Sequence, residues 1–99
     1  MRELVKLILA EGEFRDEEKL LLQKEGERVR IVVLYLGRKK ANLRLKYEIE
    51  LWARETRAEI CVFGVLLDEA RKDLTMKLDF KRGSEGASGE ELEDSLNLS

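Results

Sequence analysis

Residues 42–52 read Asn-Leu-Arg-Leu-Lys-Tyr-Glu-Ile-Glu-Leu-Trp, and this stretch decides the fold class. Apolar side chains occupy every second position: Leu43, Leu45, Tyr47, Ile49 and Leu51. The four positions between them are charged: Arg44, Lys46, Glu48 and Glu50. A repeat of two residues is typical of a β-strand with one dry and one wet face, because a helix would scatter these side chains around its axis. We therefore predict a strand over Asn42–Trp52 whose odd-numbered side chains are buried.

Similar alternation on both sides of this stretch predicts further strands. The longer ones cover Arg28–Leu36, Arg57–Leu67 and Leu74–Phe80. Shorter ones are indicated at Leu4–Leu9 and around Leu20–Leu22. Two short charged segments fit a helix as an alternative: Arg2–Leu9 and Glu90–Leu98.

Two of these strands are apolar on both faces. The second face of each consists of Val32, Leu34 and Leu36 in one strand, and of Cys61, Phe63, Val65 and Leu67 in the other. Strands of this kind are normally covered on both sides. Burying a large apolar side chain is worth about 1.5–3 kcal/mol, so we predict a homo-oligomer, most simply a homodimer, through the β-core. The competing explanation is that Leu4–Leu9 or Leu92–Leu98 covers these faces.

The spacing of the strands limits the architecture. The first apolar residues of successive strands are Val29, Leu43, Ala58 and Leu74, at intervals of 14, 15 and 16 positions. Such near-regular spacing fits an antiparallel β-sandwich or a solenoid that forms one strand every half turn. Spacing alone leaves both architectures open.

The composition changes at Gly83. Residues 83–89 hold three glycines and two serines, and residues 83–99 carry five acids and no base. We therefore predict a β-domain over residues 1–82, followed over residues 83–99 by a flexible Gly/Ser loop and a loosely held acidic tail.

The overall composition excludes several classes of protein. Nineteen Lys and Arg face 21 Asp and Glu, a formal net charge of −2, whereas nucleic-acid binders normally carry a basic excess. No apolar run approaches the ~20 residues needed to cross a bilayer, so we expect no membrane partner. A single cysteine cannot form an intrachain disulfide, and a reducing, cytoplasmic location is the simplest inference.

The absence of histidine removes most catalytic chemistry. Ser-His and Cys-His pairs and the usual Cys/His zinc sites all require this residue type. We therefore expect no enzyme, no catalytic residue, and no metal or cofactor bound by this chain alone. Cys61 could serve as a thiolate ligand of iron. Its apolar neighbours favour a small buried side chain instead.

The charged clusters are interpreted as surface features. The densest basic group is Arg38-Lys39-Lys40, followed by Arg44 and Lys46, and a solvated hairpin turn whose lysines guard a sheet edge explains it best. The acidic groups are Asp16-Glu17-Glu18, Asp68-Glu69 and Glu90-Glu91. We expect these acids to be loop charges that favour solubility.

Three motifs carry a family resemblance. They are Tyr47-Glu48-Ile49-Glu50-Leu51, Thr56-Arg57-Ala58-Glu59-Ile60 and Phe63-Gly64-Val65-Leu66-Leu67, with Asp73-Leu74 after them. In this order they resemble the core of the SufB/SufD family, the scaffold subunits of iron–sulfur cluster assembly. The resemblance covers Phe14 to Leu98. Phe80 stands where the family carries a histidine, Ser88 keeps its place, and Cys61 matches no family ligand.

The resemblance implies a short right-handed parallel β-helix, flattened, with two strands in each coil. It also implies a non-catalytic scaffold or partner role in iron–sulfur cluster assembly, with an ABC-type ATPase or another assembly subunit as a further partner. The alternative function is a β-helix module for protein–protein association without a metal role.

Overall fold

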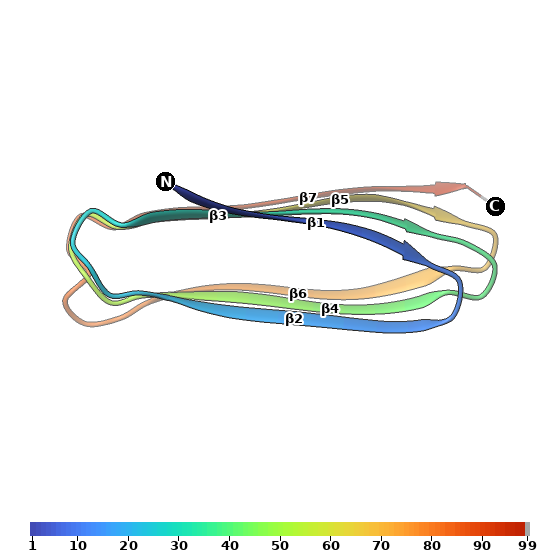
Figure 1. The fold of residues 1–99 in the computed structure, drawn as a ribbon, viewed down its shortest axis with the longest axis horizontal. Coiled ribbons are helices and arrows are strands. Elements are labelled where there is room, and N and C mark those ends of the chain that lie inside the picture. Colours follow the sequence, from blue (N-terminus) through green and yellow to red (C-terminus); the bar gives the residue numbers. More distant parts are fainter. Residues whose placement is uncertain (99) are drawn as a thin grey trace.

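The computed structural model describes residues 1–98, which form seven strands joined by short turns. The strands are β1 (Arg2–Ala10), β2 (Glu13–Leu22), β3 (Arg28–Gly37), β4 (Asn42–Leu51), β5 (Arg57–Leu67), β6 (Arg71–Phe80) and β7 (Ser88–Leu98). They alternate between two layers (Figure 1), with β1-β3-β5-β7 in sheet A and β2-β4-β6 in sheet B. Within residues 1–98, no helix has the length and apolarity needed to span a membrane.

Every strand pair in the described part of the chain is parallel. The register pairs Val29 with Ala58 and Asn42 with Arg71, in both cases 29 positions apart. Each short turn joins strands of opposite layers, and a parallel neighbour is reached only after a full coil. The chain is therefore a parallel β-helix of about three coils, as the resemblance implied, and the antiparallel sandwich is wrong.

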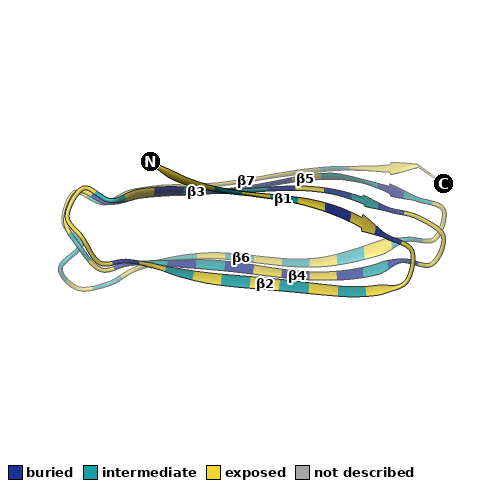
Figure 2. Cartoon of the chain, viewed as in Figure 1, coloured by how far each residue is buried: buried dark blue, intermediate teal, exposed yellow. Residues whose placement is uncertain are grey.

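The core lies between the two sheets. The odd-numbered side chains of β4 point into it and are all at most 2% exposed, which confirms the prediction from the period of two. Inward side chains of β3 and β5, among them Ile31, Val33, Ile60 and Val62, meet them from the other layer. Figure 2 shows the resulting alternation of burial along sheet B.

The coils stack at their corners through residues with positive φ. Gly26, Glu55 and Gly86 occupy equivalent places in the β2–β3, β4–β5 and β6–β7 turns, with φ values of 75°, 58° and 74°. The Gly26 amide donates to the Arg54 carbonyl, and the Glu55 amide donates to the Glu85 carbonyl. These hydrogen bonds between successive coils satisfy backbone groups of the turns, which lie outside the strand ladders.

Both ends of the chain differ from the sequence expectation. Arg2–Leu9 and Glu90–Leu98 lie in strands β1 and β7, so the helical alternative is wrong for both. Residues 88–98 are not a loosely held tail, because they pair with β5 along its whole length. The backbone of β5 offers an open edge to this segment, and that pairing outweighs the polar side chains of β7.

Strand β2 is also longer than predicted. It begins at Glu13, so Asp16-Glu17-Glu18 is part of a strand rather than a loop. Asp16 and Glu18 pair with Leu45 and Tyr47, whose side chains point into the core, so both acids point inward as well. This inward position of the two acids is tolerated because a positively charged side chain forms ion pairs with them inside the coil.

Candidate functional site

Cys61 lies in the middle of β5, on the outer face of sheet A. Its neighbours in register are Val32 on β3 and Leu92 on β7, and the residue is 8% exposed. Burial raises the pKa of the Cys61 thiol, which disfavours the thiolate that a metal ligand requires. The described residues contain no group of three His, Cys, Asp or Glu side chains placed to hold a metal ion.

The predicted basic group is divided between two places. Arg38, Lys39 and Lys40 lie in the β3–β4 turn, where Arg38 and Lys39 both form ion pairs with Glu11. Hydrogen bonds from these two side chains hold the pKa of Glu11 below its ordinary value. Arg44 and Lys46 lie on β4, on the outer face of sheet B. The turn joins two layers and is not a hairpin.

The first coil has a charged cluster inside it that the sequence analysis missed. Lys6 Nζ lies 2.8 Å from Asp16 Oδ2 and 2.8 Å from Glu18 Oε1, and the Tyr47 hydroxyl donates to Asp16 at 2.9 Å. Burial alone lowers the pKa of Lys6, but its bonds to the two acids outweigh burial and raise it. Burial and the bond to Asp16 raise the pKa of Tyr47. This cluster closes one end of the core.

A second charge pair closes the other end. Lys72 points inward from the start of β6 and forms an ion pair with Glu93 of β7, and its Nζ lies 5.8 Å from the centroid of the Tyr35 ring. Burial alone lowers the pKa of Lys72, and the bond to Glu93 more than compensates for it. The charged residues of β2 and β7 were visible in the sequence. Only the register shows that these charges face the core.

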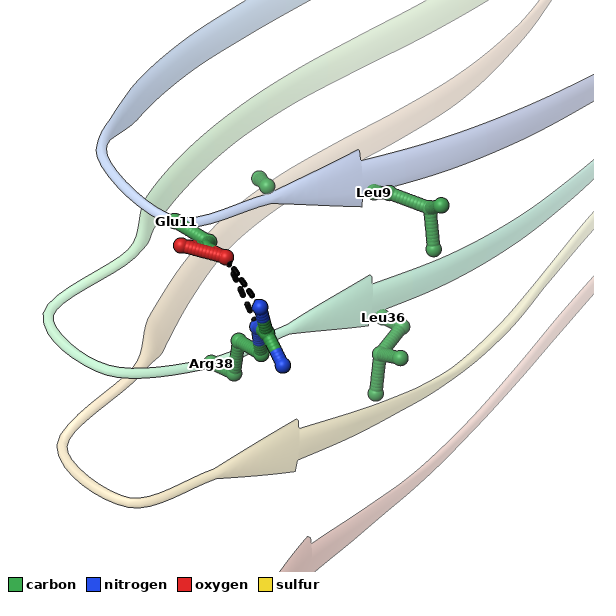
Figure 3. A pocket seen from close by; sticks show the side chains of 5 residues that line it. Leu9, Glu11, Leu36 and Arg38 are labelled. Carbon is green, nitrogen blue, oxygen red and sulfur yellow. Dashed lines mark hydrogen bonds and ion pairs between the residues drawn. The ribbon is translucent and has the colours of Figure 1, made fainter.

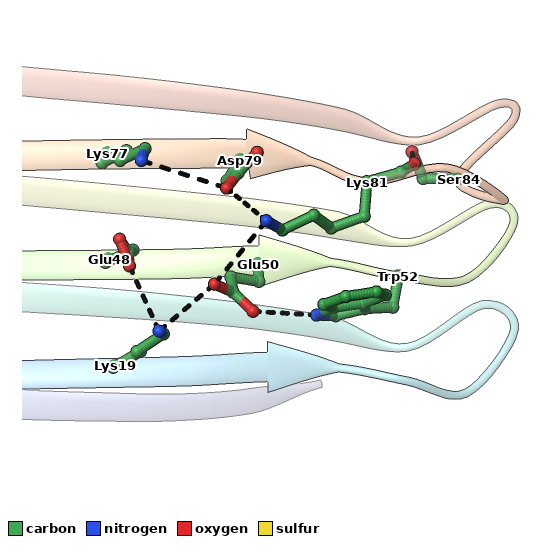
Figure 4. A network of polar contacts seen from close by, with 8 residues as sticks. All are labelled: Lys19, Glu48, Glu50, Trp52, Lys77, Asp79, Lys81 and Ser84. Atoms are coloured by element: carbon green, nitrogen blue, oxygen red, sulfur yellow. Dashed lines mark hydrogen bonds and ion pairs between the residues drawn. The ribbon is translucent and has the colours of Figure 1, made fainter.

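The outer face of sheet B carries a network of ion pairs (Figure 4). Lys19 bridges Glu48 and Glu50, while Lys81 bridges Glu50 and Asp79. The Trp52 indole donates to Glu50 at 2.9 Å, and Lys81 Nζ lies 5.3 Å from the ring centroid of Trp52. Oppositely charged side chains on neighbouring strands thus stabilise one another. The network leaves this face hydrated and charged.

The outer face of sheet A is different. Three consecutive rows run across its four strands: Val5-Val32-Cys61-Leu92, Leu7-Leu34-Phe63-Asp94 and Leu9-Leu36-Val65-Leu96. We call these twelve residues the apolar face of sheet A, and Asp94 is their one polar member. Leu7 is 77% exposed and Leu9 80%. The adjoining row, Glu3-Arg30-Glu59-Glu90, is charged, with Arg30 bound to Glu3 and Glu59. The apolar face therefore has a polar rim.

Two hollows lie in this face. One, of about 370 Å³, lies where β1 and β3 end, between Leu9, Leu36 and the Glu11–Arg38 pair (Figure 3). The other, of about 490 Å³, is lined mainly by Leu34, Phe63, Val65 and Leu96. Both are open and apolar with a charged residue at the margin. This geometry suits side chains of another protein surface better than a small polar substrate.

The predicted covering segments form two edges of this face rather than cover it. Leu4–Leu9 and Leu92–Leu98 belong to the edge strands β1 and β7 of the same sheet. Their outward leucines enlarge the apolar face. Phe80, which replaces the family histidine, lies at the end of β6 and is 50% exposed, and Ser88 begins β7 in an exposed position.

Comparison with known proteins gives one match. Residues 3–99 match the family model described as "SUF system FeS cluster assembly, SufBD core domain". Neither the curated proteins nor the solved structures contain a significant match.

Proposed function

The chain belongs to the SufBD core domain family of iron–sulfur cluster assembly, and from this premise we propose that it acts as a non-catalytic scaffold component. The extent of the family match, residues 3–99, is the observation that carries the proposal. A rigid β-helix with two chemically distinct outer faces suits a component that positions other proteins. The absence of histidine supports a role without acid–base catalysis.

The proposal includes partners. An ABC-type ATPase or another iron–sulfur assembly subunit is the expected protein partner, and a second copy of the chain is the other. Both fit a cytoplasmic protein with a single cysteine that is not in a disulfide. The charged face of sheet B and the apolar face of sheet A could serve two partners at once.

The iron–sulfur cluster is the cargo of this process, and the chain's own side chains do not fit a resident cluster. A stable cluster takes about four soft ligands, whereas the chain has one thiol, enclosed between Val32 and Leu92. Phe80 offers no donor atom at the position of the family histidine. Cluster ligands would then come from another subunit.

Co-expression with the ABC-type ATPase from the same organism tests the scaffold proposal. We expect the two proteins to elute together, and we expect iron–sulfur enzyme activity to fall in cells that lack the chain and to return when it is supplied. The ATPase expressed alone is the control. Separate elution together with unchanged enzyme activity would contradict the proposal.

Elemental analysis tests the absence of a resident cluster. Protein purified alone and without oxygen is expected to contain no stoichiometric iron or sulfide, because a single enclosed thiol cannot hold a cluster. Cys61→Ser should behave identically. Stoichiometric iron in the unchanged chain that disappears in Cys61→Ser would overturn this expectation.

An association module without a metal role is the second candidate function. The exposed apolar face of sheet A favours it, since that surface is built for contact rather than chemistry. Under this alternative the chain still binds its protein partner, while iron–sulfur enzymes keep full activity in cells that lack it.

A further inference from the structure

We propose that the apolar face of sheet A binds a short amphipathic α-helix of another protein, and that this helix carries lysine or arginine where it meets β7. The proposal rests on the association role given above, and it adds the surface and the chemistry of the partner. Its basis is the exposed apolar rows, the fully paired backbone beneath them and the acids along one margin.

The apolar face holds most of the exposed apolar side chains of the molecule. Seven of the twelve large apolar residues exposed in the described chain belong to it: Val5, Leu7, Leu9, Leu34, Phe63, Leu92 and Leu96. The outer face of sheet B contributes one, Leu21. A contiguous apolar patch with a polar rim is typical of an interaction surface.

The backbone beneath this face determines which kind of structure can bind there. Strand β3 lies between β1 and β5, and β5 lies between β3 and β7, so the amides and carbonyls of both central strands pair within the sheet. An extended peptide laid on the face would find no backbone partner and would leave its own groups unpaired. A helix, in contrast, satisfies its backbone internally.

The size of the face also favours a single helix. The three rows extend about 20 Å along the strands and about 19 Å across them, roughly 380 Å². That area is too small for a stacked sheet, since a standard interface takes about 800 Å² from each partner. A helix of three to four turns is about 16–22 Å long and about 10 Å wide with its side chains. One such helix spans the face, and we expect the modest affinity of a transient complex.

The two hollows of the face are spaced for apolar side chains of one helix. The first lies over β1 and β3, beside Leu9 and Leu36, and the second reaches from Leu34 on β3 to Leu96 on β7. Their middles are therefore one to two strand spacings apart, about 5–10 Å. Side chains at positions i and i+4, or i and i+7, of a helix are about 6 or 10 Å apart along its axis. A helix that crosses the strands thus places one apolar side chain in each hollow.

Strand β7 gives the face one acidic margin. It carries four acids and no base, and Glu90 and Asp94 among them lie on the outer face. Within the described part of the chain, Glu93 is the only acid of β7 that forms an ion pair. On the β1 margin, Glu3 and Glu11 are both paired with arginine. The uncompensated negative charge therefore lies on the β7 side, where it selects a basic residue of the partner.

Two labelled synthetic peptides of about 14 residues test the proposal. Both form amphipathic helices with the same leucines on one face, and the other face is lysine in one peptide and glutamate in the other. Fluorescence anisotropy should show the lysine peptide binding the unchanged chain with a micromolar Kd, and the glutamate peptide binding at least ~10-fold more weakly.

Two leucines of nearly equal exposure provide matched variants. Leu34, at the centre of the face, is 42% exposed, and Leu21, on the outer face of sheet B, is 41% exposed. Leu34→Asn should weaken binding of the lysine peptide at least ~10-fold, whereas Leu21→Asn should leave it unchanged. Neither substitution alters the charge of the chain.

The acidic margin has its own pair of variants. Glu90→Gln, Asp94→Asn should weaken binding of the lysine peptide at least ~3-fold and reduce its dependence on salt. Glu25→Gln, Glu85→Gln removes two exposed acids from turns outside the face and is the control of equal charge. Equal effects of the two double variants would overturn the assignment of the basic residue to β7.

Circular dichroism establishes that each variant folds. If Leu34→Asn does not, Leu96→Asn probes the same face at a site that is 56% exposed. Equal binding by the variants of the two faces, or no binding of the lysine peptide at all, overturns the proposal. So does sedimentation that shows a dimer dissociated by Leu34→Asn, because a second copy then occupies the face. Co-elution with the ATPase is measured separately, so the scaffold proposal is decided independently of these results.

Discussion

The two outer faces of this β-helix differ, although both cover the same core. Sheet B presents charged side chains that pair across its strands, and sheet A presents three apolar rows. Consecutive strands enter opposite sheets, so the difference between the faces is visible in the sequence as an alternation of two kinds of strand. The strands β3 and β5 are apolar on both sides, whereas β4 and β6 are apolar on one.

This comparison shows that the apolar residues of the sequence occupy two kinds of position in the fold. Inward apolar residues hold the two sheets together, and the exposed outward residues of sheet A are expected to contribute less to the stability of the single chain. An apolar outer face that is exposed in the monomer lowers its stability, so it is expected only where another surface covers it. The following predictions test that division.

The largest effect is expected inside the core. Leu45 on β4 is 2% exposed, so Leu45→Ala should lower the free energy of unfolding by about 2–5 kcal/mol through lost burial and a cavity. Leu34→Ala, at a site that is 42% exposed, should cost less than about 1 kcal/mol in dilute protein, where self-association is negligible. Denaturant titration measures both. Equal losses would show that the outer face already stabilises the single chain.

The sequence predicted the parts of the fold in which local pattern and burial agree. In Leu43–Leu51 each apolar residue points inward and each charge outward, so the period of two was sufficient. The same pattern could not choose between a sandwich and a solenoid, because both place alternate side chains between two sheets. The resemblance made that choice.

Prediction failed where charge lies inside the coil. Asp16 and Glu18 were assigned to a loop, and β7 was taken for a tail, because acids on the core side of a strand contradict the usual pattern. Their partners, Lys6 and Lys72, come from other strands, and only the register brings them together. The apolar face was half foreseen, since the second faces of β3 and β5 were recognised, but the terminal segments entered only as a competing cover and not as part of the face.

A smaller effect distinguishes inner charges from outer ones. Lys6→Met leaves Asp16 and Glu18 without their cation, so the free energy of unfolding should fall by about 1–3 kcal/mol. Lys19→Met removes an exposed partner of Glu48 and Glu50, and the loss should be about 0.5 kcal/mol or less. Thermal or denaturant unfolding of the two variants measures the difference. Comparable losses would mean that the cluster in the first coil is solvated like the network on sheet B.

The smallest effect concerns the response of the charged face to acid. The bond from Lys81 holds the pKa of Asp79 below its ordinary value, and the indole of Trp52, with help from Lys19 and Lys81, lowers the pKa of Glu50. A carboxyl group whose pKa is lower in the folded state favours folding above its unfolded-state pKa. That contribution is lost as the pH falls from about 4.5 through the lower folded-state values.

The double variant Glu50→Gln, Asp79→Asn lacks this contribution, so it should be slightly less stable than the unchanged chain near pH 7 and should lose less stability on acidification below about pH 4.5. Glu25→Gln, at an exposed acid of the β2–β3 turn, is the matched control for the loss of a surface carboxylate. Unfolding midpoints measured from pH 7 to pH 3 at low and high salt give the result. Salt should weaken the contribution of the network, since exposed charges are screened.

A profile that is the same in the double variant and the unchanged chain would place the acid sensitivity elsewhere. Glu59 at the rim of sheet A and Glu11 at the β1–β2 turn are the remaining carboxyl groups of lowered pKa.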